Sequence, residues 1–236
     1  DIDSENWRTR TKTKNGLLYI RPPKTGSTTF AGIHLRIARN VAVRQSLPEN
    51  KEKNNPNFPT MCKVRFEHGT AITTVPNRDQ AASFLWTVIR NPTKRAISQF
   101  FHFHVSRGKV EPSDANFQDT IIKNPLKFKS VYLRLLRHRQ PAVPPHIEER
   151  SINPNAYTVG AIIEDFDFIA ITERMEESLV VLQYLLNLPL DDILFLSAKV
   201  SGGFDDGRFQ YKCFHIIPSF VTPGMRDFFQ HNTTWH

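Results

Sequence analysis

One stretch near the N-terminus decides the fold: Gly16-Leu17-Leu18-Tyr19-Ile20-Arg21-Pro22-Pro23-Lys24-Thr25-Gly26-Ser27-Thr28-Thr29-Phe30. Its apolar beginning, residues 16–20, predicts a buried strand, which the two prolines end. Apolar residues then recur at helical spacing through Phe30, Ile33 and Ile37, so a helix is expected from Ser27 or Thr28 onward. A turn from a strand into a helix exposes the first N–H groups of the helix, and these attract anions together with the helix dipole.

The residues of this turn suit a phosphate or sulfate group. Gly26 lets the backbone approach an anion closely, Lys24 adds a mobile positive charge, and residues 27–29 supply three successive hydroxyls. The nucleotide-binding P-loop has the pattern G-x-x-x-x-G-K-[ST], in which Lys follows the second Gly. Here Lys24 precedes the glycine, so the turn fits an ATPase poorly.

The order Pro-Lys-[Thr/Ser]-Gly-[Ser/Thr]-Thr resembles the 5′-phosphosulfate loop of sulfotransferases. Those enzymes bind 3′-phosphoadenosine 5′-phosphosulfate (PAPS) and release 3′,5′-diphosphoadenosine (PAP). The resemblance implies that Lys24 is catalytic, because it would stabilise the leaving phosphate oxygen, and it implies no metal. It also implies a set of residues that hold the 5′ end of the nucleotide: Lys24, Thr25, Gly26, Ser27, Thr28 and Thr29.

A second segment has the strand, arginine and serine that the same resemblance implies for binding the 3′-phosphate. The apolar run 84–89 predicts a strand, Arg90 follows it, and Pro92 suits the first turn of a helix that contains Ser98. About two helical turns separate Arg90 from Ser98, so loop and helix can present both to one anion. In the family this pair binds the 3′-phosphate, and the planar guanidinium of Arg90 suits that task.

A third segment, 169–182, is similar to the strand-helix unit of Golgi carbohydrate sulfotransferases, closest to the galactose 3-O and hexuronic acid 2-O branch. Taken alone, its helix is an amphipathic scaffold with acidic residues in the first turn, where the helix dipole favours them. The resemblance covers residues 17–30, 62–101 and 167–182. A late segment contains Lys199, Ser201 and Gly202, which the resemblance places near the 3′-phosphate, although a solvated turn fits equally well.

Sulfuryl transfer also needs a base that removes the proton of the acceptor hydroxyl, and histidine is best matched to neutral pH. His68 follows a strand expected at 61–66 and lies 22 residues before Arg90, similar to the candidate base of the carbohydrate branch. Glu67 is the second candidate, since some related enzymes use Glu. The sequence of residues 101–104, Phe-His-Phe-His, puts its imidazoles on different helix faces, so we expect no metal site there.

Further strands are expected at 166–171 and 193–196, and further helices at 119–138 and 173–186. Alternating strands and helices predict an α/β fold of three layers, with a mostly parallel central sheet, helices on both faces and a P-loop-like nucleotide-binding core. Residues 1–15 are expected to form a flexible arm and residues 16–236 a single domain. Specificity is expected to lie in the loops 44–60, 107–118 and 139–156.

The charge is unevenly spread along the 236 residues. Residues 1–150 contain 26 of the 31 Lys and Arg but only 12 of the 23 Asp and Glu. The net charge of the whole chain is +8. This surplus indicates an anionic partner. We expect a hydroxyl-bearing acceptor, foremost a glycan, and a basic patch at 123–139 would suit an anionic one. Alternatives are a sulfotransferase for small alcohols or phenols, a variant P-loop kinase, and a non-catalytic protein that binds anions or, less in keeping with the motifs, nucleic acid.

The cellular compartment follows from the resemblance rather than from composition. The carbohydrate branch implies the Golgi lumen or secretory pathway, with membrane attachment only through an N-terminal anchor outside this sequence, as in a type II membrane protein; a cytoplasmic enzyme is the alternative. Cys62 and Cys213 fit one long-range disulfide or two buried thiols equally well.

Overall fold

The computed structural model describes residues 16–46, 68–128, 131–137, 154–195 and 224. The expected arm at 1–15 and the strand expected at 61–66 lie outside these ranges, as do both cysteines. None of the helices in the described ranges combines the length and the hydrophobicity needed to cross a bilayer.

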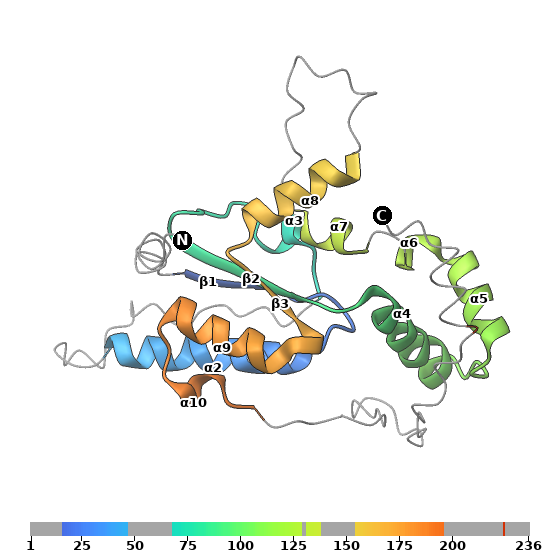
Figure 1. Cartoon of the computed structure of the whole chain (residues 1–236), viewed down its shortest axis with the longest axis horizontal. Helices are drawn as coiled ribbons and strands as arrows, with labels where there is room; N and C mark the ends of the chain where they lie inside the picture. The colour runs from blue at the N-terminus through green and yellow to red at the C-terminus, as the bar shows by residue number, and fades with distance from the viewer. Residues whose placement is uncertain (1–15, 47–67, 129–130, 138–153, 196–223, 225–236) are drawn as a thin grey trace, which may run out of the picture.

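Three parallel strands form the sheet in this part of the chain: β1 (Gly16–Ile20), β2 (Ser83–Ile89) and β3 (Phe168–Ile171), in the order β1-β2-β3. β2 lies in the middle and is buried along almost its whole length, as its near-continuous apolar sequence predicts for a parallel strand covered on both faces. The three carboxyl ends therefore meet at one edge of the sheet, and the chain leaves β1 and β2 there as Arg21 and Arg90 (Figure 1).

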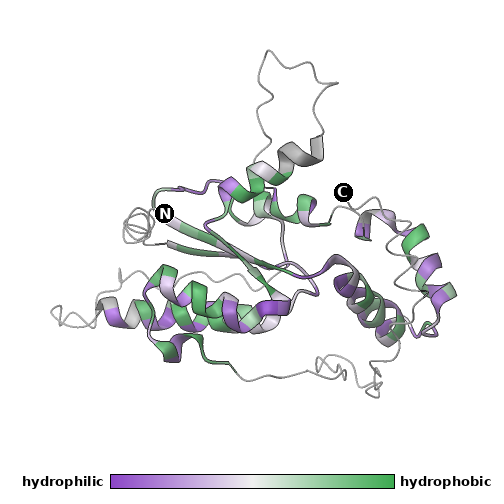
Figure 2. Cartoon of the chain, in the orientation of Figure 1, coloured by the Kyte–Doolittle hydropathy of each residue, from purple (hydrophilic) through white to green (hydrophobic). Residues whose placement is uncertain are grey.

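One face of the sheet is covered by α2 (Ser27–Ser46), α9 (Met175–Leu186) and α10 (Leu190–Ile193), which lie together in Figure 1. Phe84, Trp86 and Val88 of β2 pack there against Phe30 and Leu182 in the main core cluster. Hydrophobic residues are frequent along both α2 and α9 (Figure 2), and those that recur at helical spacing on α2, namely Phe30, Ile33 and Ile37, are buried in this core.

The opposite face is covered by α3 (Ala71–Thr74), α7 (Val131–Leu136) and α8 (Pro154–Asp165). Leu85 of β2 packs there with Leu136 and Ile162, in a second cluster that also contains Phe166. Successive residues of β2 thus point into two different cores, because side chains alternate across a strand. The expected α/β fold of three layers, with helices on both faces of a parallel sheet, is confirmed.

A third apolar cluster holds the helices that follow β2. It is formed by α4 (Pro92–Phe100), the π-helix η1 (Phe101–Arg107), α5 (Asp114–Lys123) and α6 (Pro125–Phe128), with Phe100, Phe117 and Phe128 at its centre. α4 begins directly after the carboxyl end of β2, and its first residue is Pro92, as predicted. Asn91 caps it by accepting a hydrogen bond from the N–H of Lys94.

Four details of the predicted secondary structure are wrong. The single helix expected at 119–138 is divided into α5, α6 and α7, because Asn124 ends α5 and Pro125 starts a new helix. The helix α2 continues into the loop expected at 44–60. The helices α5 and α8 start inside the loops expected at 107–118 and 139–156.

The strand expected at 193–196 is the fourth error, because Ile193 ends α10 and residues 194–195 adopt no regular structure. The buried carboxylate of Asp192 explains this helical turn: it accepts hydrogen bonds from Asn40 and Arg44 of α2. These contacts hold α10 against α2, and Ile193 packs into the main core from there.

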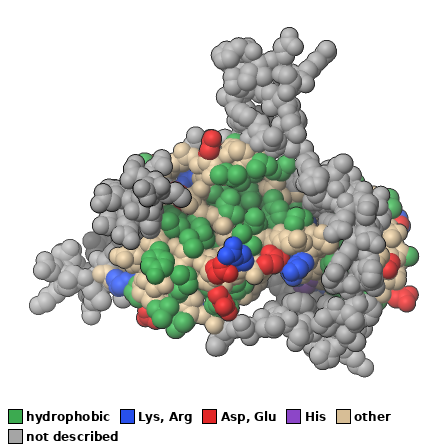
Figure 3. Space-filling model, viewed as in Figure 1, with side chains coloured by type: hydrophobic (Ala, Val, Ile, Leu, Met, Phe, Trp, Pro, Cys, Tyr) green, Lys and Arg blue, Asp and Glu red, His purple; other side chains and the backbone are tan. Residues whose placement is uncertain are grey.

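Hydrophobic side chains also gather on the outside of the molecule, over α8 and α9 in the view of Figure 3. The exposed residues there include Ile163 of α8, and Val181 and Tyr184 of α9. Basic and acidic side chains lie close together between these two groups (Figure 3).

Candidate active site

The turn between β1 and α2 has an uncommon backbone. Gly26 has φ +67° and Lys24 has φ +66°, so both lie in the left-handed region, which a lysine rarely occupies. The carbonyl oxygen of Gly26 accepts hydrogen bonds from the N–H groups of Thr29 (3.0 Å) and Phe30 (3.4 Å), and these bonds start α2. Left-handed residues before a helix N-terminus form the concave backbone that binds anions in many proteins.

Gly26 is also required by close packing on its other side. A Cβ atom at this position would lie 3.3 Å from Cγ2 of Thr172 and 3.4 Å from Cε of Met175. These two residues follow the carboxyl end of β3, so the turn after β1 lies directly against the chain after β3. The left-handed backbone and this tight contact both disfavour a side chain at residue 26.

Hydroxyl groups fix the shape of the turn. Thr25 is fully buried, and its Oγ1 donates to the carbonyl oxygen of Pro22 at 3.0 Å. Oγ1 of Thr172 lies within hydrogen-bond distance of two carbonyl oxygens, 2.7 Å from Thr25 and 2.9 Å from Ile89. Thr172 thereby joins the turn after β1 to the end of β2. Of the first two of the three hydroxyl residues that begin α2, Ser27 is buried, whereas Thr28 is exposed and accepts a hydrogen bond from Arg21 at 3.0 Å.

Arg90 lies beside the same turn. Its Nη1 donates to the carbonyl oxygen of Lys24 at 3.3 Å, so the two predicted anion-binding segments, 66 residues apart in sequence, are in direct contact. The side chain is 29% exposed, and Nε lies 3.9 Å from the carboxylate of Glu173. Burial lowers the pKa of Arg90, while the negative charge of Glu173 opposes that shift. Arginine stays charged through such changes, and the exposed part of the guanidinium can receive an anion.

His68 contacts the residue that begins this turn, Arg21. Its Nδ1 is 3.0 Å from the carbonyl oxygen of Arg21. A carbonyl accepts only, so Nδ1 carries the proton in the neutral ring, and Nε2 keeps a lone pair. Partial burial lowers the pKa of His68, and the positive charges of Arg21 and Lys24 act in the same direction, against the hydrogen bond to Arg21. Partial burial and the neighbouring positive charges therefore favour the neutral imidazole.

Of the remaining predicted site residues, Ser98 alone lies within the described ranges. Ser98 lies on α4, two turns after Arg90, and is half-buried. Glu67, Lys199, Ser201 and Gly202 lie outside the described residues. The described ranges contain no cluster of three His, Cys, Asp or Glu side chains that could hold a metal ion.

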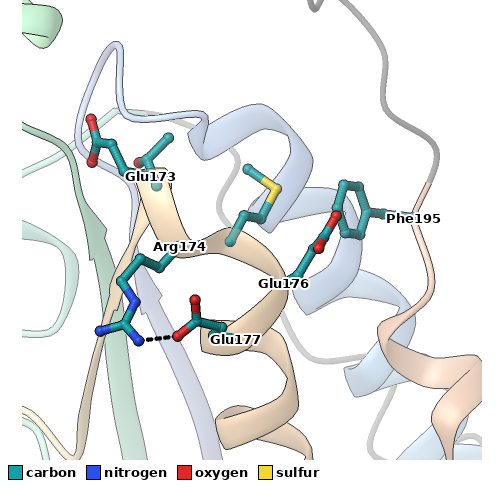
Figure 4. Close-up of a pocket in the computed structure, with 7 residues that line it drawn as sticks. Glu173, Arg174, Glu176, Glu177 and Phe195 are labelled. Carbon is teal, nitrogen blue, oxygen red and sulfur yellow. Dashed lines mark hydrogen bonds and ion pairs between the residues drawn. The ribbon is translucent and has the colours of Figure 1, made fainter.

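A small cavity adjoins the turn on the side of β3. It has a volume of about 340 Å³, and its lining includes Thr172, Glu173, Met175 and Phe195. Figure 4 shows that Glu173 is turned away from Glu176 and Phe195, and that Arg174 pairs with Glu177. Glu173 instead accepts the N–H of Asn91, at 3.1 and 3.2 Å from its two oxygens.

Sequence reasoning missed four residues that shape this site: Arg21, Tyr132, Thr172 and Glu173. Three of them carried a usable signal, because polar residues directly after parallel strands meet at the carboxyl edge of the sheet. Arg21 follows β1, and Thr172 and Glu173 follow β3. Tyr132 lies on α7, and its spacing in the sequence gave no such indication.

The sequence model of the Sulfotransferase family matches residues 7–191, well over half of the chain. The protein therefore belongs to the sulfotransferase family, and the class of reaction is transfer of a sulfuryl group. Searches among curated proteins and among solved structures gave no significant match.

Two glycine substitutions test the geometry of the turn. We expect Gly26→Ala to lower the free energy of unfolding by more than about 1 kcal/mol, because the new Cβ meets Thr172 and the backbone is left-handed. Gly32→Ala is the matched control: it lies within α2 with no heavy atom within 4 Å of the added Cβ, and it should raise the stability by about 0.5–1 kcal/mol. Urea unfolding of both variants provides the measurement, and equal stabilities would contradict the described turn.

Proposed function

We propose that this protein transfers the sulfuryl group of PAPS to a hydroxyl of a carbohydrate, with His68 as the general base. The observation that carries the proposal is the hydrogen bond from Arg90 to the carbonyl oxygen of Lys24. It joins the two anion-binding segments that a nucleotide with phosphate groups at both ends requires.

The residues around the turn fit such a donor. The first N–H groups of α2, which follow the left-handed turn at Lys24 and Gly26, suit the 5′ end of the nucleotide, with Lys24 and Ser27–Thr29 as further donors. Arg90, with Ser98 on the next helix, would hold the 3′-phosphate. Bound there, PAPS supplies the sulfuryl group and a phosphate leaving group.

Lys24 would contribute by charge. Negative charge grows on the leaving phosphate oxygen during sulfuryl transfer, as it does in phosphoryl transfer, and a positioned cation stabilises it. The left-handed backbone at Lys24 determines the direction in which its side chain leaves the turn, and the neighbouring Pro23 and the buried Thr25 restrict the backbone on either side. No metal is needed in this scheme.

His68 would remove the acceptor proton at Nε2. The hydrogen bond between Nδ1 and the carbonyl of Arg21 selects the tautomer with that lone pair free of a proton and orients the ring. After the acceptor proton arrives, the imidazolium would still donate through Nδ1 to the same carbonyl. Glu67 remains the second candidate for this role.

Exposed positive charge and the resemblance to carbohydrate sulfotransferases both point to a glycan as the acceptor. Several exposed basic residues belong to α4, α6 and α7 or follow α7: Lys94, Lys127, Arg134 and Arg137. These helices also hold or adjoin Arg90 and Tyr132, so an anionic glycan is a fitting acceptor, and the Golgi lumen or secretory pathway is the matching compartment. A small alcohol or phenol is the alternative acceptor.

A PAPS-dependent assay against glycans, steroids, phenols and small alcohols, read as PAP release, tests this function. We expect turnover with a glycan and a loss of about 100-fold in Lys24→Ala, in line with the removal of one transition-state donor. The control is Lys109→Ala, a lysine that also has a positive φ, 54°, but follows η1. Turnover only with a phenol or alcohol would show that the acceptor is a small molecule rather than a glycan. Equal rates in the two variants would show that Lys24 has no catalytic role.

The pH dependence tests His68. Only the neutral imidazole accepts a proton, and its pKa is lowered from about 6.5, so kcat should fall on acidification with a midpoint below that value. We expect His68→Gln to lower kcat by at least about 100-fold and to abolish this acid limb. His104→Gln is the matched control, because the pKa of His104 is lowered by burial and by Lys127 but the residue lies in η1. An unchanged acid limb in His68→Gln would assign the base to another group, with Glu67 next in order.

A further inference from the structure

The backbone of Arg90 is held by one side chain. The hydroxyl of Tyr132 accepts the N–H of Arg90 at 2.8 Å and donates to the carbonyl oxygen of Arg90 at 2.7 Å. Arg90 lies between the end of β2 at Ile89 and the start of α4 at Pro92, so both of its backbone groups fall outside the two regular elements. A single hydroxyl, 42 residues later in the chain, supplies both partners.

The ring of Tyr132 is itself fixed. It packs against the core on the α7 side of the sheet, and the guanidinium of Arg95 lies 5.9 Å from its centroid. Arg95 is fully buried and donates to Oε1 of Gln99 and to the carbonyl oxygen of Lys127. Burial raises the pKa of Tyr132 to about 12, so the hydroxyl keeps its proton and donates throughout the physiological range.

The next residue is held from the opposite side. The carboxylate of Glu173 accepts the N–H of Asn91, and Nη1 of Arg90 reaches the carbonyl of Lys24. Hydrogen bonds thus hold both the backbone and the side chain of Arg90 in the ligand-free protein. An arginine that is already ordered loses less conformational entropy when an anion binds.

From these contacts we infer that Tyr132 is a positioning residue, which holds Arg90 in the orientation that receives the 3′-phosphate of the donor. The inference rests on the proposed function, in which Arg90 binds that phosphate. Tyr132 itself touches the backbone of Arg90 and acts through it.

The test compares two nucleotides that differ in the 3′-phosphate alone. Isothermal calorimetry gives the affinities for PAP and for adenosine 5′-monophosphate, and their ratio reports the contribution of the 3′-phosphate. Tyr132→Phe removes both hydrogen bonds and keeps the ring, so we expect this ratio to fall by about fivefold to tenfold. Affinity for adenosine 5′-monophosphate should stay within about twofold of wild type, whereas a merely structural role would weaken both nucleotides alike.

The matched control is Tyr184→Phe, the same change on the exposed side of α9, which should leave the ratio unchanged. In an Arg90→Ala background the ratio should already be low, with only the contribution of Ser98 left, and Tyr132→Phe should lower it no further. A wild-type ratio near one would overturn the proposed role of Arg90, and this inference with it. A large wild-type ratio that Tyr132→Phe leaves intact would overturn the inference alone.

A measurement on the wild-type protein covers the case in which Tyr132→Phe does not fold. The amide of Arg90 donates to the Tyr132 hydroxyl, so its hydrogen exchange should be slow in the free protein and slower still with PAP, but not with adenosine 5′-monophosphate. Exchange of this amide as fast as in an unstructured peptide would overturn the inference.

Discussion

The hydrogen bond from the guanidinium of Arg90 to the carbonyl oxygen of Lys24 is the contact on which the proposed site depends. It exists because β1 and β2 are parallel neighbours, so the chain leaves both strands at the same edge of the sheet. Arg90 follows one strand, and the turn that contains Lys24 and Gly26, the proposed site of the 5′ end of the donor, follows the other. A nucleotide that carries phosphate at both its 5′ and 3′ ends needs cationic groups in two places, and this edge provides both.

The third strand completes the arrangement. Thr172, directly after β3, lies within hydrogen-bond distance of the carbonyl oxygens of Thr25 and Ile89, and its methyl group lies against Gly26. Glu173 accepts the N–H of Asn91. The segment after β3 thus contacts the segments after β1 and β2, and Tyr132 approaches Arg90 from α7 on the other face. Contacts from all three layers therefore determine where the positive charges of the site lie.

Much of this arrangement was predictable from the sequence, and the rest was not for identifiable reasons. Lys24, Gly26 and Arg90 stand at strand ends with a strong apolar pattern before them, so their meeting followed from parallel pairing alone. Tyr132 lies in a segment predicted as one long helix, which Asn124 and Pro125 divide, and its contact with Arg90 depends on how those short helices pack. The apolar residues around Ile193 predicted a strand, but Ile193 ends α10. The buried carboxylate of Asp192 holds this helix through Arg44 and Asn40, which lie about 150 residues away in the sequence, and local patterns do not encode such contacts.

A crystal structure of this protein with PAP would test most directly the claim that the turn after β1 and Arg90 bind the two ends of one nucleotide. We predict the 5′-phosphate at the first N–H groups of α2 and the 3′-phosphate against the guanidinium of Arg90, with Nε2 of His68 facing the side from which an acceptor hydroxyl would enter. A nucleotide bound elsewhere, or bound with its 3′-phosphate away from Arg90, would contradict it.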